Sequence, residues 1–240
     1  MALNAAFVNG VQYNATGSST SIPFSALNLT AGNLLVVLIR WEGGGATDTA
    51  TATLADTAGN TYTLLDYRST GSGEGHRMGV FYCLNALGHA SNAVTATLSE
   101  ARTYREGYVA QYSYDGAIQL GDTGNGGSGS NQTTVTSAPA LTAEAADLVL
   151  GALGHYNSAY NFTPSAEYTQ RSDNTHLIGF FDQIPASSFN EAPGGTISGV
   201  GDSYNLLTAV FEAVAEDPDA FPEPLPPAFG VFKRVRGRAG

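Results

Sequence analysis

Residues 34–39 read Leu34-Leu35-Val36-Val37-Leu38-Ile39, an apolar run with no polar side chain at either alternate set of positions. Successive side chains of a strand point to opposite faces, so a strand of this sequence must be buried on both faces. A buried helix could show the same run, but six residues is the length of a strand. The run therefore predicts a central β-strand.

Short strand-like segments recur along the rest of the chain. Runs rich in Val, Thr, Tyr, Phe and Leu alternate with clusters of Gly, Asn and Asp, a pattern typical of a sandwich or barrel. Residues 94–99 alternate apolar with polar side chains, which predicts one packed face and one wetted face. The predicted strands lie near residues 5–8, 20–24, 33–41, 50–56, 61–68, 76–86, 93–99, 104–114, 133–137, 146–156, 167–172, 176–183, 195–199 and 203–214.

An internal repeat organises these segments. Residues 31–36, 76–81 and 93–112 are echoed in the same order by residues 145–150, 176–181 and 195–211. A period near 100 residues exceeds the roughly 20–50 residues of solenoids and propellers. We therefore predict one sandwich with both repeats contributing to both sheets. Two small separate domains are the alternative, although each would have a poor core.

The predicted fold class is all-β: a jelly-roll-like β-sandwich formed from two related halves, with an extended C-terminal arm. The sandwich spans residues 1–214, with the halves at about 20–115 and 136–214, and the arm spans 215–240. The join at residues 121–134 reads GDTGNGGSGSNQTT, and its composition predicts a flexible loop.

Charge and cysteine content restrict the partners and the compartment. The formal net charge of −11 disfavours binding to phosphate backbones and anionic lipids, so we expect neither nucleic acid nor membrane as a partner. Cys83 is the single cysteine, which excludes an intrachain disulfide and fits folding in a reducing cytoplasm. The N-terminal residues lack the pattern of a secretory signal, so we expect release by lysis or by an unrecognised route if the protein leaves the cell.

Motifs for catalysis and metal binding are weak. The four histidines show no H-E-x-x-H or H-x-H spacing, and we interpret His76 and His176 as hydrogen-bonded residues at strand ends. No G-x-S-x-G motif is present, and Cys83 has no neighbouring histidine to activate it. We predict no enzyme, no cofactor and no metal. Two alternatives remain. One is a pair of carboxylates for glycoside hydrolysis, assembled across a sheet, and the other is a calcium site at the turns 56–60 and 121–125.

Aromatic side chains are the best candidates for a sugar-binding face, because an exposed aromatic platform stacks on sugar rings. Core packing is the alternative for each of them. The candidates are Trp41, Tyr67, Tyr156 and Tyr160.

The arm has a different composition from the body. Five of the ten prolines lie beyond residue 214, which predicts an extended spacer. The segment after it mixes apolar and basic side chains, which predicts docking on a neighbour, with a disordered tail as the alternative. The predicted interface residues are Phe229, Val231, Phe232, Lys233, Arg234 and Arg236.

Five features carry a resemblance to a known group. The first is the turn Asp56-Thr57-Ala58-Gly59-Asn60-Thr61-Tyr62-Thr63. The others are the Phe81-Tyr82 strand, the Thr/Val strand at 93–99, the aromatic strand ending Tyr112-Ser113-Tyr114-Asp115-Gly116, and the later strand Leu148-Val149-Leu150-Gly151. Over residues 20–214 the chain resembles a loosely defined group of jelly-roll domains of phage virion proteins and bacterial surface proteins. These motifs are structural and bear on fold more than on function.

The resemblance implies a non-enzymatic virion structural protein, of the capsid decoration or cement type or a tail component. Its partners would be other virion proteins, among them the major capsid protein, and copies of itself, with a trimer expected by analogy. Its location would be the virion, after synthesis in the host cytoplasm. A carbohydrate-binding or receptor-binding module is the alternative.

Overall fold

The computed structural model describes residues 3–43, 48–70, 75–128, 132–156, 159–173, 177–199 and 203–214. Within these ranges the chain forms 20 β-strands, paired antiparallel, and no helix. Accordingly, the described part of the chain holds no helix long and apolar enough to span a bilayer. The all-β prediction is confirmed.

The first ten strands form one half of the molecule. A five-stranded sheet has the order β1-β10-β4-β7-β6, and β2-β9-β5 and β3-β8 lie opposite it. The bounds are β1 (Ala6–Ala15), β2 (Ser19–Pro23), β3 (Leu27–Leu29), β4 (Leu34–Glu42), β5 (Ala52–Asp56), β6 (Thr63–Ser69), β7 (His76–Cys83), β8 (His89–Asn92), β9 (Val94–Arg102) and β10 (Tyr104–Ser113).

The next ten strands repeat this order. Their sheets are β11-β20-β14-β17-β16, β12-β19-β15 and β13-β18, so each strand corresponds to the one ten positions earlier. First pairs with last, second with next to last, as in a rolled hairpin of the jelly-roll kind. The bounds are β11 (Ile118–Ser128), β12 (Thr134–Thr136), β13 (Leu141–Ala143), β14 (Leu148–His155), β15 (Phe162–Pro164), β16 (Thr169–Gln170), β17 (Ile178–Gln183), β18 (Phe189–Glu191), β19 (Gly194–Ile197) and β20 (Tyr204–Ala213).

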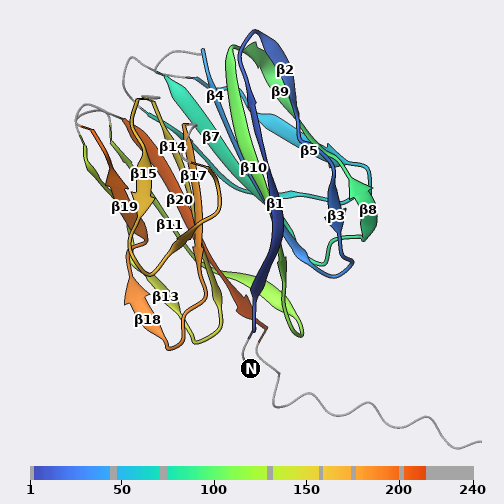
Figure 1. Ribbon diagram of the computed structural model, residues 1–240, viewed down its shortest axis with the longest axis vertical. Coiled ribbons are helices and arrows are strands. Elements are labelled where there is room, and N and C mark those ends of the chain that lie inside the picture. Colours follow the sequence, from blue (N-terminus) through green and yellow to red (C-terminus); the bar gives the residue numbers. More distant parts are fainter. Residues whose placement is uncertain are drawn as a thin grey trace, which may run out of the picture.

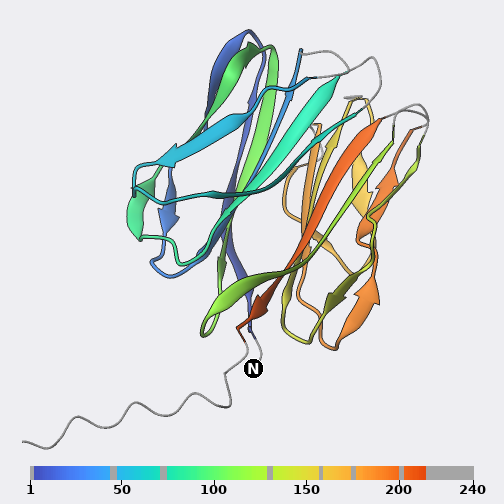
Figure 2. The same cartoon turned by 180° about the vertical axis from the view of Figure 1, so that it is seen from behind.

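The two halves stack through their five-stranded sheets. Figures 1 and 2 show four layers, with the small sheets outside and the two large sheets facing each other in the middle. The repeat and the two related halves are confirmed, but the prediction that both repeats share both sheets is wrong. Every sheet pairs strands of one half alone. Each half builds its own sandwich, and the large sheets meet face to face.

Burial of β4 on both faces explains the apolar run at residues 34–39. On β4, Leu34, Val36 and Leu38 belong to a cluster shared by both halves, and the residues between them belong to the core of the first half. Strand β14 is arranged in the same way, with Leu148 and Leu150 in the shared cluster and Val149 in the core of the second half. By contrast, residues 94–99 on the outer strand β9 alternate buried with solvent-facing side chains, as predicted.

The glycine-rich join is largely strand rather than loop. Strand β11 covers its first part and pairs with β20 along nearly its whole length. A Cβ on Gly126 would lie 2.2 Å from the carbonyl oxygen of Thr136, and one on Gly124 would lie 2.8 Å from Oγ1 of Thr208. The glycines allow close backbone approach, which composition alone does not distinguish from flexibility. Residues 129–131 lie outside the described ranges.

Replacing Phe180 by alanine should lower the free energy of unfolding by about 3–5 kcal/mol, because a large buried side chain is lost from a packed core. The ring is fully buried in the shared cluster and stacks on Tyr108 with centroids 5.1 Å apart. Denaturant unfolding measures the change. The control Leu87→Ala, at a side chain 56% exposed, should change stability by less than about 0.5 kcal/mol. Equal effects of the two variants would contradict the shared core.

Candidate functional site

Two hollows in the described part of the chain contain no ionisable side chain other than Tyr82 at the edge of the first. An apolar cavity of about 10 Å³ lies between the two large sheets, lined by side chains such as Val36, Val80, Leu150 and Phe180. A space of that size with apolar walls has room for one water at most. A shallow groove of about 330 Å³ lies over the sheet β12-β19-β15, and threonines and a serine line it without any ionisable side chain. Neither hollow resembles a catalytic cleft.

The turn that carries the resemblance is held by Asp56. Its Oδ1 accepts from the backbone N–H of Asn60 at 2.9 Å. Its Oδ2 accepts from the side chains of Asn60, Tyr62 and Asn92 at 2.7, 2.7 and 3.0 Å. Burial opposes ionisation, but these hydrogen bonds outweigh it and lower the pKa of Asp56. These hydrogen bonds give the carboxylate its role in fixing the turn, which is the alternative to calcium binding at this site.

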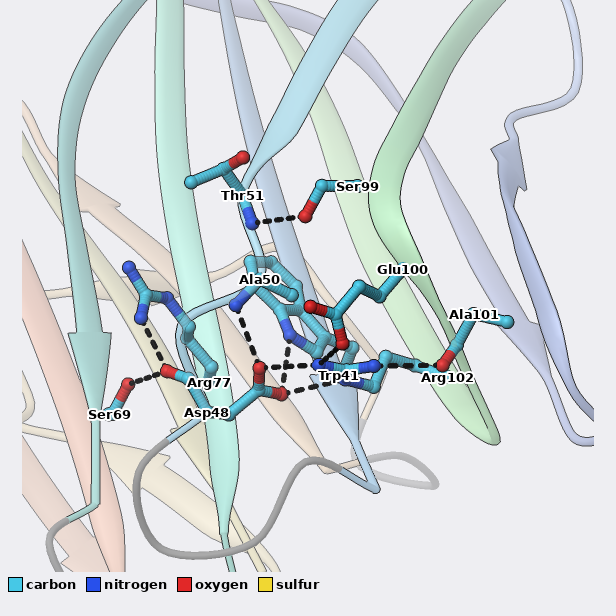
Figure 3. A network of polar contacts seen from close by, with 10 residues as sticks. All are labelled: Trp41, Asp48, Ala50, Thr51, Ser69, Arg77, Ser99, Glu100, Ala101 and Arg102. Carbon is cyan, nitrogen blue, oxygen red and sulfur yellow. Dashed lines mark hydrogen bonds and ion pairs between the residues drawn. The ribbon is translucent and has the colours of Figure 1, made fainter.

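A second hydrogen-bonded carboxylate, Asp48, is buried at the end of the first half where β4 ends. Figure 3 shows it between the indole of Trp41 and the guanidinium of Arg102. Oδ2 accepts from Trp41 Nε1 and Arg102 Nε, both at 2.9 Å. Oδ1 accepts from Arg102 Nη2 at 2.8 Å and from the backbone N–H of Ala50 at 2.9 Å. The backbone carbonyl of Asp48 accepts from Arg77 and Ser69.

The buried charge of Asp48 is balanced by the neighbouring Arg102. Burial raises the pKa of the carboxyl, but the hydrogen bonds from Arg102, Ala50 and Trp41 have the larger combined effect and lower it. Arg102 also binds Glu100, whose side chain is 62% exposed. An ion pair saturated by donors in this way stabilises the fold and has no lone pair directed at a substrate.

A third polar cluster lies between the halves, at the same upper end. We call it the polar seam and define it as Arg40, Glu42, His76, Glu106, His155 and Asn205, all buried. Arg40 binds Glu42 and lies 3.9 Å from Oε2 of Glu106. That same oxygen accepts from the backbone N–H of Leu177, in the second half, at 3.0 Å. Charged groups of one half are thereby tied to the backbone of the other.

His76 is the histidine of the polar seam that lies on β7. Its Nε2 lies 3.2 Å from the carbonyl oxygen of Gly154 and donates to it. In the orientation that satisfies both ends of its amide, Asn205 also accepts from this nitrogen at 3.2 Å. The prediction of a hydrogen-bonded strand-end histidine is confirmed for His76, while His176 lies outside the described residues. Burial, with Arg40 as the second cause, holds the pKa of His76 well below its usual range.

A further polar contact joins the halves lower down. Tyr112 Oη donates to Asp182 Oδ2 at 2.5 Å, and Arg171 binds the same carboxylate through Nε and Nη2 at 2.8 and 3.0 Å. The guanidinium of Arg171 lies 4.2 Å from the ring centroid of Phe7. Burial and the nearby carboxylate raise the pKa of Tyr112 well above its usual range, so the hydroxyl stays a donor.

The four predicted sugar-binding aromatics do not form one exposed row. Trp41 is fully buried, so the prediction that it belongs to an exposed sugar-binding face is wrong. Its indole N–H donates to the buried carboxylate of Asp48. Tyr67 is half-buried; its hydroxyl bonds both backbone groups of Ala52, and its ring packs edge-on against Trp41. Tyr156 and Tyr160 are half-buried in the second half. Core packing accounts for the first two.

The remaining predicted residues are Cys83 and those of the C-terminal arm. Cys83 is buried, and burial raises the pKa of its thiol to about 11. Among the described residues no group of three or more His, Cys, Asp or Glu side chains could hold a metal. The predicted interface residues Phe229, Val231, Phe232, Lys233, Arg234 and Arg236 lie outside the described ranges.

Asp48 and, apart from His76, the polar seam were not predicted from the sequence, although one signal for the seam is present there. Arg40 and Glu42 continue the strand that begins with the doubly buried run 34–39. A charged pair within such a strand indicates a buried ion pair. Asp48 had no comparable signal, because its partner Arg102 lies 54 residues away.

Comparison with protein-family models, curated proteins and solved structures finds no match.

Replacing Asp48 by asparagine should cost about 3–5 kcal/mol at pH 7, because Arg102 would remain buried without its main counter-charge. Glu100→Gln is the matched control on the same arginine and should cost no more than about 1 kcal/mol, since Glu100 is exposed. Because the folded pKa of Asp48 is lowered, its contribution is complete above its unfolded value of about 3.9. It is lost as the pH falls through the folded value. Chemical denaturation at pH 7 and pH 3 should show the gap between wild type and Asp48→Asn shrinking in acid.

Proposed function

We propose that this chain is a non-enzymatic structural protein of a bacteriophage virion, of the capsid decoration or cement type, with a tail component as the next choice. Its partners are other virion proteins, among them the major capsid protein, and further copies of itself. By analogy with decoration proteins the assembly is a trimer. Nucleic acid and membrane are not among its partners, and its location is the virion after synthesis in the host cytoplasm.

The observation that carries this proposal is the division of charge between body and arm. Residues 215–240 hold four acidic and four basic side chains, so the net charge of −11 belongs to residues 1–214. None of the six arginines in that part, Arg40, Arg68, Arg77, Arg102, Arg105 and Arg171, is exposed. The exposed charges of the described body are carboxylates: Asp66, Glu100, Asp115, Asp122, Glu144, Glu167, Asp173 and Glu191.

The arm complements this surface. A proline-rich spacer is followed by two aromatic residues, Phe229 and Phe232. Four basic residues come directly after them: Lys233, Arg234, Arg236 and Arg238. A basic segment is drawn to an acidic surface, and buried aromatic side chains are common anchors of interfaces. A spacer of 14 residues, 215–228, reaches about 43 Å in a polyproline conformation, enough to contact a neighbouring subunit.

The internal contacts of the body also support a structural role. Asp48, Asp56 and Asp182 are each bound by several donors of the chain itself, so they serve the fold. The first and last described residues lie near the turn between β10 and β11: the Val214 N–H donates to the carbonyl of Ala117, and the Asp115 N–H donates to the carbonyl of Leu3. Both ends of the body lie at its lower end in Figure 1, opposite the polar seam.

Deleting residues 219–240 should leave the body folded and weaken self-association or attachment to particles by at least about tenfold, since buried anchors and charge complementarity are lost together. Analytical ultracentrifugation and binding to particles lacking the protein measure this. The paired variants Phe229→Ala/Phe232→Ala and Lys233→Gln/Arg234→Gln/Arg236→Gln separate the apolar anchors from the charges. Raised salt screens charges, so it should weaken binding of the wild-type chain about as much as the Lys233→Gln/Arg234→Gln/Arg236→Gln variant does at low salt. The Phe229→Ala/Phe232→Ala variant should lose affinity at low and at high salt alike.

Unchanged affinity of the truncated chain would exclude this role for the arm. The wider proposal has its own test, mass spectrometry of purified particles. Detection of the chain only in secreted or cell-wall fractions would overturn it.

A further inference from the structure

The polar seam places titratable groups where the two halves meet. Strand β4 contributes Arg40 and Glu42, β10 contributes Glu106, β7 contributes His76, and β14 contributes His155. All are at most 9% exposed, and Asn205 of β20 completes the cluster. Charged and polar groups thus replace apolar side chains in this part of the contact between the sandwiches.

His76 lies where a second positive charge is hard to accommodate. Its side chain is fully buried, and Nε2 donates across the contact to the carbonyl of Gly154. The other ring nitrogen, Nδ1, has no hydrogen-bond partner among the described residues. Arg40 fills the same space, since a Cβ on Gly154 would lie 3.3 Å from its Cδ. Protonation at Nδ1 would therefore place a buried imidazolium beside a buried guanidinium.

The carboxylates nearby are already engaged. Glu42, directly opposite His76 across the β4–β7 ladder, binds Arg40. Glu106 lies near Arg40 and accepts from the backbone N–H of Leu177 in the other half. His155 also belongs to the contact with Leu177, because its backbone N–H donates to the Leu177 carbonyl at 2.9 Å. A carboxylate that turned toward a charged His76 would leave Arg40 or the second half.

We propose that the upper end of the contact between the halves is an acid-sensitive joint, at which uptake of a proton by His76 separates the two sandwiches. The contact at the other end of the two large sheets stays closed. There Arg171 and Tyr112 hold Asp182, and the apolar cluster continues toward the termini. The joint opens from the end that carries the polar seam, and the halves stay attached through the rest of the shared cluster.

The direction of the pH dependence follows from the lowered pKa of His76. Above about pH 6.5, the usual value for histidine, the ring is neutral both in the closed joint and in the open one. Below it, the open joint binds a proton that the closed joint excludes. The equilibrium constant for opening therefore rises up to tenfold per pH unit, until the pH reaches the folded pKa.

Hydrogen exchange of the full-length protein between pH 7.5 and pH 5 tests this. After division by the intrinsic rates, protection of the His155 and Leu177 amides should fall up to tenfold per pH unit, while the β5–β9 ladder should keep its protection. His76→Gln keeps a donor near Nε2 without a titratable ring and should abolish the fall. His89→Gln removes a histidine outside the polar seam and should behave as wild type.

An equal fall in His76→Gln and wild type would overturn the proposal, as would the absence of any fall in wild type. If His76→Gln does not fold, an NMR titration of the histidine ring protons in wild type decides instead. The His76 signal should change together with the opening of the amides at the joint. An ordinary titration of His76 near pH 6.5 with those amides unchanged would also overturn the proposal.

Discussion

Burial of both faces of the two five-stranded sheets is the constraint on which the rest of this structure depends. Leu34, Val36 and Leu38 of β4 meet Leu148 and Leu150 of β14 in one cluster, and the alternate residues of each strand fill the core of its own half. Each large sheet can be apolar on both sides only because the other covers it. The halves therefore depend on each other for the burial of one face.

This constraint determines how polar groups are treated inside the molecule. A charge that enters a doubly buried sheet has no route to water, so it must find partners within the protein. Arg40 finds them in Glu42 and Glu106, and Asp182 in Arg171 and Tyr112. Because these partners come from both halves or touch the backbone of the other half, the same groups that satisfy buried charge also determine how the sandwiches are placed.

All six arginines of the body are buried or half-buried, and its exposed charged side chains among the described residues are carboxylates. Surfaces of like charge repel each other, so a net charge of this sign opposes close contact between bare copies of the body. The assembly that we propose takes account of this repulsion, because the basic segment of each arm would offer the acidic surface of a neighbour an attractive contact.

The sequence by itself determined the fold class, the repeat and most strand positions, because the period of apolar side chains and the turn residues are local properties. The run 34–39 required a strand buried on both faces, and residues 94–99 required one wetted face; the structure has both. Which sheet covered the second face of β4 was decided by tertiary structure, as was the pairing of the glycine-rich strand β11 with β20. Asp48 with Arg102, and His76 with Gly154, are brought together across 54 and 78 residues, and no local pattern records such separations. The sequence specifies the chemistry of each side chain. Which side chain pairs with a buried charge depends on the packing of elements that are distant along the chain.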